Sequence, residues 1–425
     1  MTNSRWMKVA MLAAVTMVPV QAAWAQSAPA ADPIAPLPEA QAAPVAQPAP
    51  PPLPPLLWQV HQVQMLAAYI NGVGREGLNP ADYDLTGLDA AMRSGDPMLM
   101  SQAATQRFNL LSSDLALGHV RGEARVDWHI VDKDLDEMRQ RALLEAALRD
   151  NRIADALNGL LPTHPQYAAL RHALSLTTAA DVDKLNKIRL NMDRWRWLPR
   201  DLGQKYIIVN VPAFYATLVE NGATRWKQRA VAGAIKTPTP QISALATGVI
   251  LNPWWEVPKS IEPEVRGKAG YVPVKGKDGK VQRWRQPPGP SNALGELKFV
   301  MYNPQLIYLH DTNARSRFNS QVRALSHGCV RTQKVHDLAA ELGSDDGGEW
   351  TRERIAQVIA SKKTVEAKFV KPVPVHIVYF SVAALNDGSI QTYQDLYKRD
   401  GKVIAALNDS TGKAPGAPVK KVATN

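Results

Sequence analysis

The chain is almost free of cysteine, with Cys329 as the only one among its 425 residues. A single thiol excludes an internal disulfide and leaves two roles for this residue, a reactive nucleophile or an inert buried side chain. A second cysteine and an HExxH motif, both typical of zinc sites, are missing as well. Zinc would therefore need Cys329 together with His310 and His327, which is a weaker interpretation than a reactive thiol.

Apolar segments long enough to cross a membrane are also lacking. Residues 1–8 carry Arg5 and Lys8, and the apolar run at 9–20 is shorter than the roughly 20 residues of a spanning helix. Ala-Trp-Ala at 23–25 fits a signal-peptidase site. We expect a signal peptide at 1–25, with a short membrane anchor as the alternative, and an exported protein that has no transmembrane segment after cleavage.

Residues 26–57 contain little besides alanine and proline, so this segment cannot bury a core. Polyproline geometry rises about 3.1 Å per residue, which gives a reach on the order of 90 Å. We expect a linker here, either a semi-rigid spacer or a disordered N-terminal segment.

Acidic residues are outnumbered by basic ones, which gives a formal charge of +11. Such an excess indicates anionic partners, and for an exported protein these are carboxylate-bearing peptides, anionic glycans or lipid head groups. The sequence has no run of Lys and Arg with interleaved aromatic residues. We therefore expect no nucleic-acid partner.

Two hydrophobic patterns divide the rest of the chain. Apolar residues recur at helical spacing within 58–200, and short β-branched runs bounded by Pro, Gly and Asn follow from residue 201. We expect an α+β protein with a helical N-terminal scaffold domain at 58–200, a mainly-β domain at 201–408 with a mainly antiparallel sheet, and a basic flexible tail at 409–425. The expected strands lie at 206–211, 229–233, 248–251, 297–301, 306–310 and 373–380, and two expected helices lie at 335–342 and 351–359.

A polar insertion rich in Gly, Pro and Lys interrupts the second domain at 258–293. Loops of this length within a compact domain are usually functional or disordered. We therefore expect a lid or binding flap, with disorder as the alternative.

The run LSHGCVR at 325–331 carries the chemistry. An ordinary thiol is only slightly ionised at neutral pH, so a catalytic cysteine needs a base or a positive field beside it. His327 stands two residues before Cys329, and His310 ends an expected strand upstream. His310 could take the thiol proton and later pass it to a leaving amine, while a neighbouring carbonyl or Asp311 would fix its tautomer.

Gly328 permits a tight turn in this run. The N–H groups of Gly328 and Cys329 could then point to one spot and form an oxyanion hole. The remaining histidines have no such neighbours, and we expect them to be structural: His61, His119, His129, His164, His172, His336 and His376.

Ser-His-Gly-Cys followed by an apolar residue and Arg, with a histidine on an upstream strand, resembles the signature of the YkuD-type L,D-transpeptidase catalytic domain. Further segments resemble the large periplasmic branch called YcbB-like. They are MDRWRWLP at 192–199, NPWWEVP at 252–258, RQPPGPSNALG at 285–295 and YLHDT at 308–312. The resemblance covers most of the chain from residue 58 to about residue 407.

The resemblance implies a catalytic domain at 201–408, with 258–293 as its capping lid. It also implies a nucleophile, a general base that is held by the neighbouring backbone, and groups that bind the substrate. The implied catalytic residues are Cys329, His310 and His327, the oxyanion or backbone contributors are Gly328 and Asp311, and the substrate-binding residues are Arg331, Ser326, Trp255 and Tyr308.

The implied function is that of a periplasmic peptidoglycan L,D-transpeptidase that needs no cofactor or metal. The thiolate would attack a stem peptide, release its terminal D-alanine and form a thioester. An amine on a neighbouring stem would then give a 3-3 cross-link, with 1-3 as the other linkage, and carbapenems would acylate the enzyme. Two alternatives stay open: an L,D-carboxypeptidase or endopeptidase that uses water as acceptor, and a non-catalytic envelope scaffold.

Overall fold

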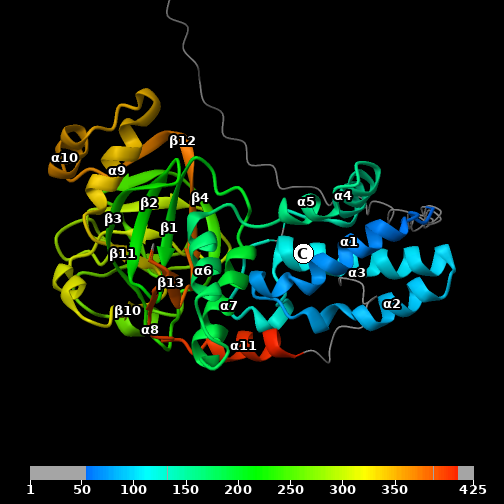
Figure 1. Ribbon diagram of the computed structural model, residues 1–425. Helices are drawn as coiled ribbons and strands as arrows, with labels where there is room; N and C mark the ends of the chain where they lie inside the picture. Colours follow the sequence, from blue (N-terminus) through cyan, green and yellow to red (C-terminus); the bar gives the residue numbers. More distant parts are fainter. Residues whose placement is uncertain (1–53, 132, 386, 410–425) are drawn as a thin grey trace, which may run out of the picture. The chain divides into compact units, whose positions relative to one another are not determined.

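The computed structural model describes residues 54–131, 133–385 and 387–409 (Figure 1). The expected signal peptide, most of the linker and nearly all of the expected tail lie outside these residues. Among the helices of the described ranges, none has both the length and the apolar composition that crossing a membrane requires.

The described part of the chain has seven α-helices between residues 60 and 196, which confirms the expected helical domain. Side-chain caps fix several of their starts. Asp96 accepts hydrogen bonds from the N–H groups of Met98 and Leu99, and Asp136 accepts one from Arg139. The bounds are α1 Val60–Asn71, α2 Leu85–Arg93, α3 Pro97–Leu117, α4 Glu137–Arg149, α5 Ile153–Asn158, α6 Pro165–Ser175 and α7 Val182–Arg196.

The MDRWRWLP run ends α7 and is buried throughout residues 192–198. Asp193 accepts hydrogen bonds from the His119 N–H at 2.6 Å and from the Trp197 indole at 2.9 Å. Arg194 forms a 2.8 Å ion pair with Asp400, which lies in the C-terminal helix α11 (Asp400–Asn408). This run therefore joins α7 to a helix that is distant in sequence. Removing either partner of the ion pair would leave a buried charge uncompensated.

A nine-stranded, mainly antiparallel sheet follows, as expected. Its strand order is β10-β3-β11-β9-β8-β4-β12-β1-β2, and β3 also pairs with β2, so the sheet curls round and closes on itself. The bounds are β1 Lys205–Asn210, β2 Tyr215–Glu220, β3 Ala223–Gly233, β4 Ile242–Leu251, β8 Leu297–Met301, β9 Leu309–His310, β10 Ala324–Ser326, β11 Val330–Thr332 and β12 Val365–Val378. Beyond the sheet lie a hairpin of β13 (Val382–Ala384) and β14 (Ile390–Thr392) and then α11.

Two helices after β11 agree closely with expectation. They are α9 (Val335–Ser344) and α10 (Arg352–Ala360), and Thr351 caps α10 by accepting a hydrogen bond from the Arg354 N–H. The expected strand at 306–310 is shorter in the structure, where β9 begins only at Leu309. The reason is local: the Asn303 side chain bonds both the N–H and the C=O of Ile307, so these groups cannot join a strand.

The insertion at 258–293 has secondary structure of its own, so the alternative of a disordered segment is wrong. It contains α8 (Glu262–Val265), β6 (Val272–Lys275) and β7 (Val281–Gln286), and β7 pairs with β5 (Trp255–Glu256). A small apolar cluster stabilises it, formed by Val257, Ile261, Val265, Trp255, Tyr271 and Trp284. We call residues 258–293 the lid.

The helical domain and the sheet share one hydrophobic core. Trp195 of α7 stacks on Phe380 at 4.5 Å between ring centroids, and Tyr206 and Val219 of the sheet belong to the same cluster. A second core fills the interior of the sheet and packs α9 against β12 and β4. The sheet that bears Cys329 is therefore anchored to helices on more than one side.

Candidate active site

Cys329 lies in a tight turn between β10 and β11. Gly328 has φ +115°, a backbone conformation that favours glycine. The buried Ser326 hydroxyl donates a hydrogen bond to the Cys329 carbonyl at 2.6 Å and accepts one from the Gly328 N–H at 3.1 Å. Ser326 therefore closes the turn, and within the described chain the Gly328 N–H has a partner whereas the Cys329 N–H has none.

The loop after β3 stabilises this turn through hydrogen bonds from two threonines. Thr239, which is fully buried, donates to the Gly328 carbonyl at 2.7 Å and accepts from the Gly233 N–H at 2.8 Å. Thr237 donates to the Ser326 carbonyl at 3.0 Å. Because both threonines bond the backbone of the turn, the position of Cys329 is fixed by buried hydrogen bonds.

His310 lies in the centre of a row of three basic side chains. β9 lies between β11 and β8, and His310 pairs in register with Arg331 on one side and with Lys298 on the other. Directly paired residues project to the same face of a sheet. The next row on this face contains Cys329 and Tyr308, whose ring lies 5.7 Å from that of His310. The structure thus brings the predicted nucleophile and the predicted base to adjacent strands.

Burial keeps both groups in their neutral forms. It raises the pKa of the Cys329 thiol, against an opposite effect of Tyr308, Lys298 and Arg331. Burial, together with the nearby Arg331, lowers the pKa of His310 to about 3. At neutral pH the unliganded site therefore holds a thiol and a neutral imidazole, so the proton transfer between them has to be promoted by what binds there.

Tyr308 lies beside the thiol, and Trp255 contacts Tyr308. The Cys329 Sγ lies 3.7 Å from the Leu306 carbonyl oxygen. Burial raises the pKa of Tyr308, the adjacent Cys329 raises it further, and a hydrogen bond with Trp255 opposes this. Trp255 also makes an edge-on contact with Tyr271 of the lid, at 6.2 Å between ring centroids. These contacts connect the lid to the neighbourhood of the thiol.

His327 contacts the lid. Its Nε2 lies 3.2 Å from the Glu264 carboxylate of α8. Both side chains are about half exposed, His327 at 43% and Glu264 at 56%. This interaction makes His327 a contact between the cysteine turn and the lid, whereas His310 is buried in the sheet.

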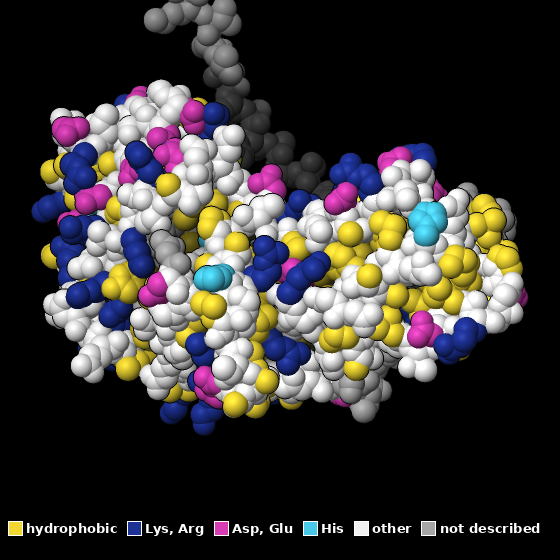
Figure 2. Space-filling model, in the orientation of Figure 1, with side chains coloured by type: hydrophobic (Ala, Val, Ile, Leu, Met, Phe, Trp, Pro, Cys, Tyr) yellow, Lys and Arg dark blue, Asp and Glu magenta, His cyan; other side chains and the backbone are white. Residues whose placement is uncertain are grey.

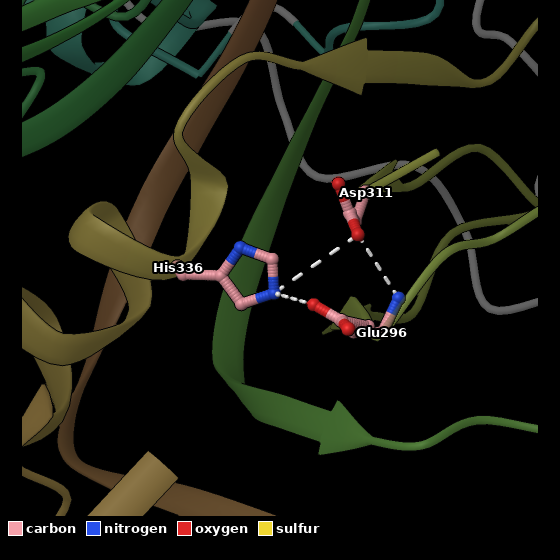
Figure 3. Close-up of side chains that lie close together, drawn as sticks. All are labelled: Glu296, Asp311 and His336. Carbon is pink, nitrogen blue, oxygen red and sulfur yellow. Dashed lines mark hydrogen bonds and ion pairs between the residues drawn. The ribbon is translucent and has the colours of Figure 1, made fainter. Parts of the chain in front are cut away.

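Asp311 belongs to a charged cluster beside β9 (Figure 3). Its carboxylate accepts a hydrogen bond from the Glu296 N–H at 3.0 Å and one from Arg315 at 2.9 Å, and His336 lies 3.1 Å from the Glu296 carboxylate. The ligand atoms of Glu296, Asp311 and His336 lie within 4.8 Å of one another, a spacing that a metal ion could use. However, Arg315 also contacts Glu296 at 3.3 Å, so a guanidinium already supplies the positive charge that these two carboxylates require.

The His310 ring lies near backbone groups of Asp311 and Leu294, and the charge of the Asp311 carboxylate acts on it as well. The backbone groups of Asp311 and Leu294 raise the pKa of His310 against the effect of burial. Its Nδ1 has no hydrogen-bond partner of good geometry within the described residues. Asp311 therefore fixes the end of β9 through its own bonds to Glu296 and Arg315.

Two residues of this region were not singled out from the sequence. Lys298 is the single charge in an apolar strand, Leu-Lys-Phe-Val-Met at 297–301, and this pattern was the available signal. Glu264 had no such signal, because its contact with His327 joins residues 63 positions apart. Figure 2 shows that Lys and Arg side chains are spread over the sheet-bearing part of the face in view, with fewer Asp and Glu among them.

Two family models match the chain. One, described as the L,D-transpeptidase catalytic domain (YkuD), matches residues 204–359, and the other, described as a scaffold domain, matches residues 55–174. A Haemophilus influenzae protein that is itself only provisionally named an L,D-transpeptidase is 29% identical over 292 residues, which are 62% of this chain. The match spans 58% of that relative's length.

The solved structures that match the chain have low sequence identity and low TM-scores. An L,D-transpeptidase from Mycobacterium smegmatis is 14% identical, with 41% of this chain and 58% of that chain covered and a TM-score of 0.22. The catalytic domain of an Enterococcus faecium L,D-transpeptidase acylated by ertapenem is also 14% identical, with 42% and 99% covered and a TM-score of 0.21.

Proposed function

Because the family model of the L,D-transpeptidase catalytic domain (YkuD) matches residues 204–359, we propose that this protein is a cysteine acyltransferase that cross-links peptidoglycan stem peptides. One observation carries the proposal. Cys329 lies in a hydrogen-bonded turn that leads directly into β11, the strand that pairs in register with the strand of His310. Acyl transfer requires the nucleophile and the base within hydrogen-bond reach, and neighbouring strands allow this.

In the first half-reaction, the Cys329 thiol gives its proton to His310 and the sulfur attacks the carbonyl carbon of an L-centre followed by D-alanine. The bond from this carbon to the D-alanine nitrogen then breaks, and His310 returns the proton to that nitrogen. The products are free D-alanine and a thioester on Cys329. His310 serves as base and then as acid, as general acid–base catalysis requires.

In the second half-reaction, a side-chain amine of a neighbouring stem attacks the thioester. Its proton passes through His310 to the departing sulfur, which restores the thiol. We propose a 3-3 linkage as the main product, with 1-3 as the other. The acceptor and the donor then meet above Cys329, with Trp255 and the lid as one wall of the groove.

The oxyanion of each tetrahedral intermediate needs a donor at the turn. The Cys329 N–H has no partner within the described residues, whereas the Gly328 N–H bonds Ser326. We assign the Cys329 N–H as the main backbone donor, with Gly328 providing the turn geometry. One such donor typically contributes about 3 kcal/mol to stabilisation of the transition state.

The proposed setting is the periplasm, reached by way of the signal peptide. Stem peptides carry several carboxylates, which suits the positive charge of the chain. Carbapenems should acylate the same sulfur, because a strained lactam carbonyl is an acyl donor whose ring opening leaves a thioester. The reaction as written uses only Cys329, His310 and backbone groups, so the proposal includes no metal and no cofactor.

Intact-protein mass spectrometry tests this proposal. The mature protein is incubated with a carbapenem and, separately, with tetrapeptide muropeptides, and the Cys329→Ser variant is the control. We expect an adduct at Cys329 in both reactions, cross-linked dimers with muropeptides, and neither with the variant. Trimmed monomers without dimers would instead establish a hydrolase. A Cys329→Ala strain with unchanged wall composition, together with no adduct, would establish a scaffold.

A further inference from the structure

Lys298, His310 and Arg331 form one row across three adjacent strands. Lys298 of β8 is paired with His310 of β9, and His310 is paired with Arg331 of β11. The row borders the sulfur, because both cations act electrostatically on Cys329. A neutral imidazole therefore stands between two positive charges, directly beside the nucleophile.

Neither cation has an ion pair within the described residues. The Lys298 Nζ lies 5.2 Å from the centre of the Tyr308 ring, and its acidic neighbour Glu256 is already paired with Arg283 at 3.0 Å. Arg331 is half-buried, and its Nε has neither solvent contact nor a hydrogen-bond partner. Arg317, another cation, acts electrostatically on Arg331 and lowers its pKa.

Unpaired cations at such depth are costly, because burial removes hydration that no protein anion replaces. Burial accordingly lowers the pKa of Lys298 and of Arg331. An anion placed between them would remove this cost. The guanidinium fork matches a carboxylate with two parallel hydrogen bonds, and the ammonium adds a third donor.

We propose that Lys298 and Arg331 together bind a carboxylate of the donor peptide beside the scissile carbonyl, so that the enzyme selects free-acid stem peptides over amidated ones. We call this pair the carboxylate cradle. The selection of peptides rests on the proposed function, whereas the affinity of the cradle for carboxylates does not. Lys298 is thus a specificity-determining residue.

The cradle also links donor binding to catalysis. An empty cradle disfavours a proton on His310, since Arg331 opposes the imidazolium charge. A bound carboxylate neutralises this field, so His310 accepts the thiol proton more readily when the correct donor is present. The donor itself then activates the nucleophile, and an amidated donor does not.

The first experiment uses two alkylating probes that need no peptide chemistry. Iodoacetate and iodoacetamide both alkylate the thiol with loss of iodide, but only iodoacetate carries a carboxylate. We expect the ratio of the iodoacetate to the iodoacetamide rate to fall on the order of tenfold in Lys298→Met, the scale of one lost charge-assisted hydrogen bond. An unchanged ratio would overturn the cradle.

The matched control is Lys227→Met. Lys227 of β3 also lies over a tyrosine ring, at 4.9 Å from the centre of Tyr215, but it is exposed and outside the row. We expect the wild-type ratio in this variant. An equal fall in both lysine variants would show a general effect of net charge and would contradict the proposal.

The second experiment compares acyl-enzyme formation with a free-acid tetrapeptide donor and with its side-chain carboxamide. We expect the wild-type protein to prefer the free acid in kcat/KM by about tenfold or more, and Lys298→Met to lose most of this preference. Acylation without any preference would refute the cradle and leave the proposed function intact. Absence of acylation by any donor, with the iodoacetate preference present, would refute the proposed function and leave the cradle.

A third experiment asks whether the cradle binds carboxylates selectively or binds any small anion. The iodoacetate reaction is run with added phosphate and, separately, with added chloride at the same ionic strength. We expect the two salts to slow the reaction equally, because the cradle is shaped for a planar carboxylate. A specific block by phosphate at low millimolar concentration would make the row a general anion site and overturn the selectivity for carboxylates.

Discussion

The His327 imidazole and the Glu264 carboxylate lie 3.2 Å apart, and they join the turn that carries Cys329 to helix α8 of the lid. His327 is two residues from the sulfur, so any movement of the lid at this point is transmitted to the cysteine turn. The pair is half exposed, and interactions of this kind contribute at most about 1 kcal/mol to stability.

Glu264→Gln should loosen the lid without unfolding the protein. We expect faster amide hydrogen exchange in residues 258–286 and a change in the free energy of unfolding below about 1 kcal/mol. Hydrogen exchange with mass-spectrometric detection measures the first, and urea denaturation measures the second. Glu366→Gln, an exposed glutamate of β12, is the control and should leave exchange in the lid unchanged. Unchanged exchange in Glu264→Gln would mean that other contacts hold the lid.

Gly328→Ala should impair acylation. At φ +115° an added Cβ is strained, and it would lie 3.4 Å from the Ile307 side chain. We expect a stability cost of about 1–3 kcal/mol and a fall in the acylation rate on the order of 100-fold, because the sulfur is displaced. Gly222→Ala is the control, since Gly222 also has positive φ but has open space around its Cβ position. Acylation at the wild-type rate in Gly328→Ala would show that the turn tolerates a side chain.

Arg315→Gln should destabilise the protein more than an ordinary surface pair would. Its partner Asp311 is only 5% exposed, and it would keep a buried charge with one donor fewer. We expect a loss of about 1–3 kcal/mol, measured by chemical denaturation, with slower acylation as the end of β9 loosens. Arg225→Gln removes an equally exposed arginine whose partner Glu220 is more accessible, and it should cost less than about 1 kcal/mol.

A chelator should leave the wild-type protein unchanged. Arg315 contacts both carboxylates of the Glu296, Asp311 and His336 cluster, so an ion is not needed to neutralise them. We expect identical thermal unfolding and carbapenem acylation before and after prolonged dialysis against EDTA. A fall in the melting temperature that zinc restores would show that the cluster binds a metal in solution.

Stability should fall as the pH is lowered from 7 to 4. Burial lowers the pKa of His164 and His376 to about 4 and that of His310 to about 3, below the ordinary value of 6.5. Below pH 6.5 these histidines become protonated in the unfolded chain but stay neutral in the folded protein. The free energy of unfolding therefore decreases by up to about 1.4 kcal/mol per pH unit for each histidine. Denaturation at several pH values measures this slope.

His164→Asn should reduce that slope. Asn can keep the N-cap that His164 provides to the Gln166 N–H at the start of α6. The variant loses the stacking on Trp195 at every pH, so the comparison uses the slope and not the absolute stability. An unchanged slope between pH 6.5 and 4 would mean that His164 is protonated in the folded protein.

The closeness of Cys329 and His310 in the fold could be predicted because the sequence signals of both residues are local. Cys329 follows a glycine within one turn, and His310 ends an apolar run, so each had a recognisable sequence environment. Lys298 and Glu264 could not be predicted in the same way, because their contacts depend on how β8 pairs with β9 and on where the lid folds. Strand register and lid position are non-local, and no short pattern encodes them.

The fold shows the same division. Helices α9 and α10 were predicted almost to the residue because amphipathic spacing and the Thr351 cap are local. The lid strands β6 and β7 were missed, because four to six residues with Lys, Arg and Gln resemble a loop until their few apolar side chains meet around Trp284. The extension of β12 back to Val365 depends on its partner β4, which no pattern within β12 reveals.

Because Trp195 stacks on Phe380, the catalytic part of the chain depends on the helices for part of its core. A fragment beginning at residue 201 would leave Phe380, Tyr206 and Val219 facing water, because their apolar neighbours belong to the helices. Such a fragment would be prone to aggregate. The helical part therefore cannot be exchanged independently of the sheet. Substitutions along α7 would require compensating changes in the residues of the sheet domain that share its core.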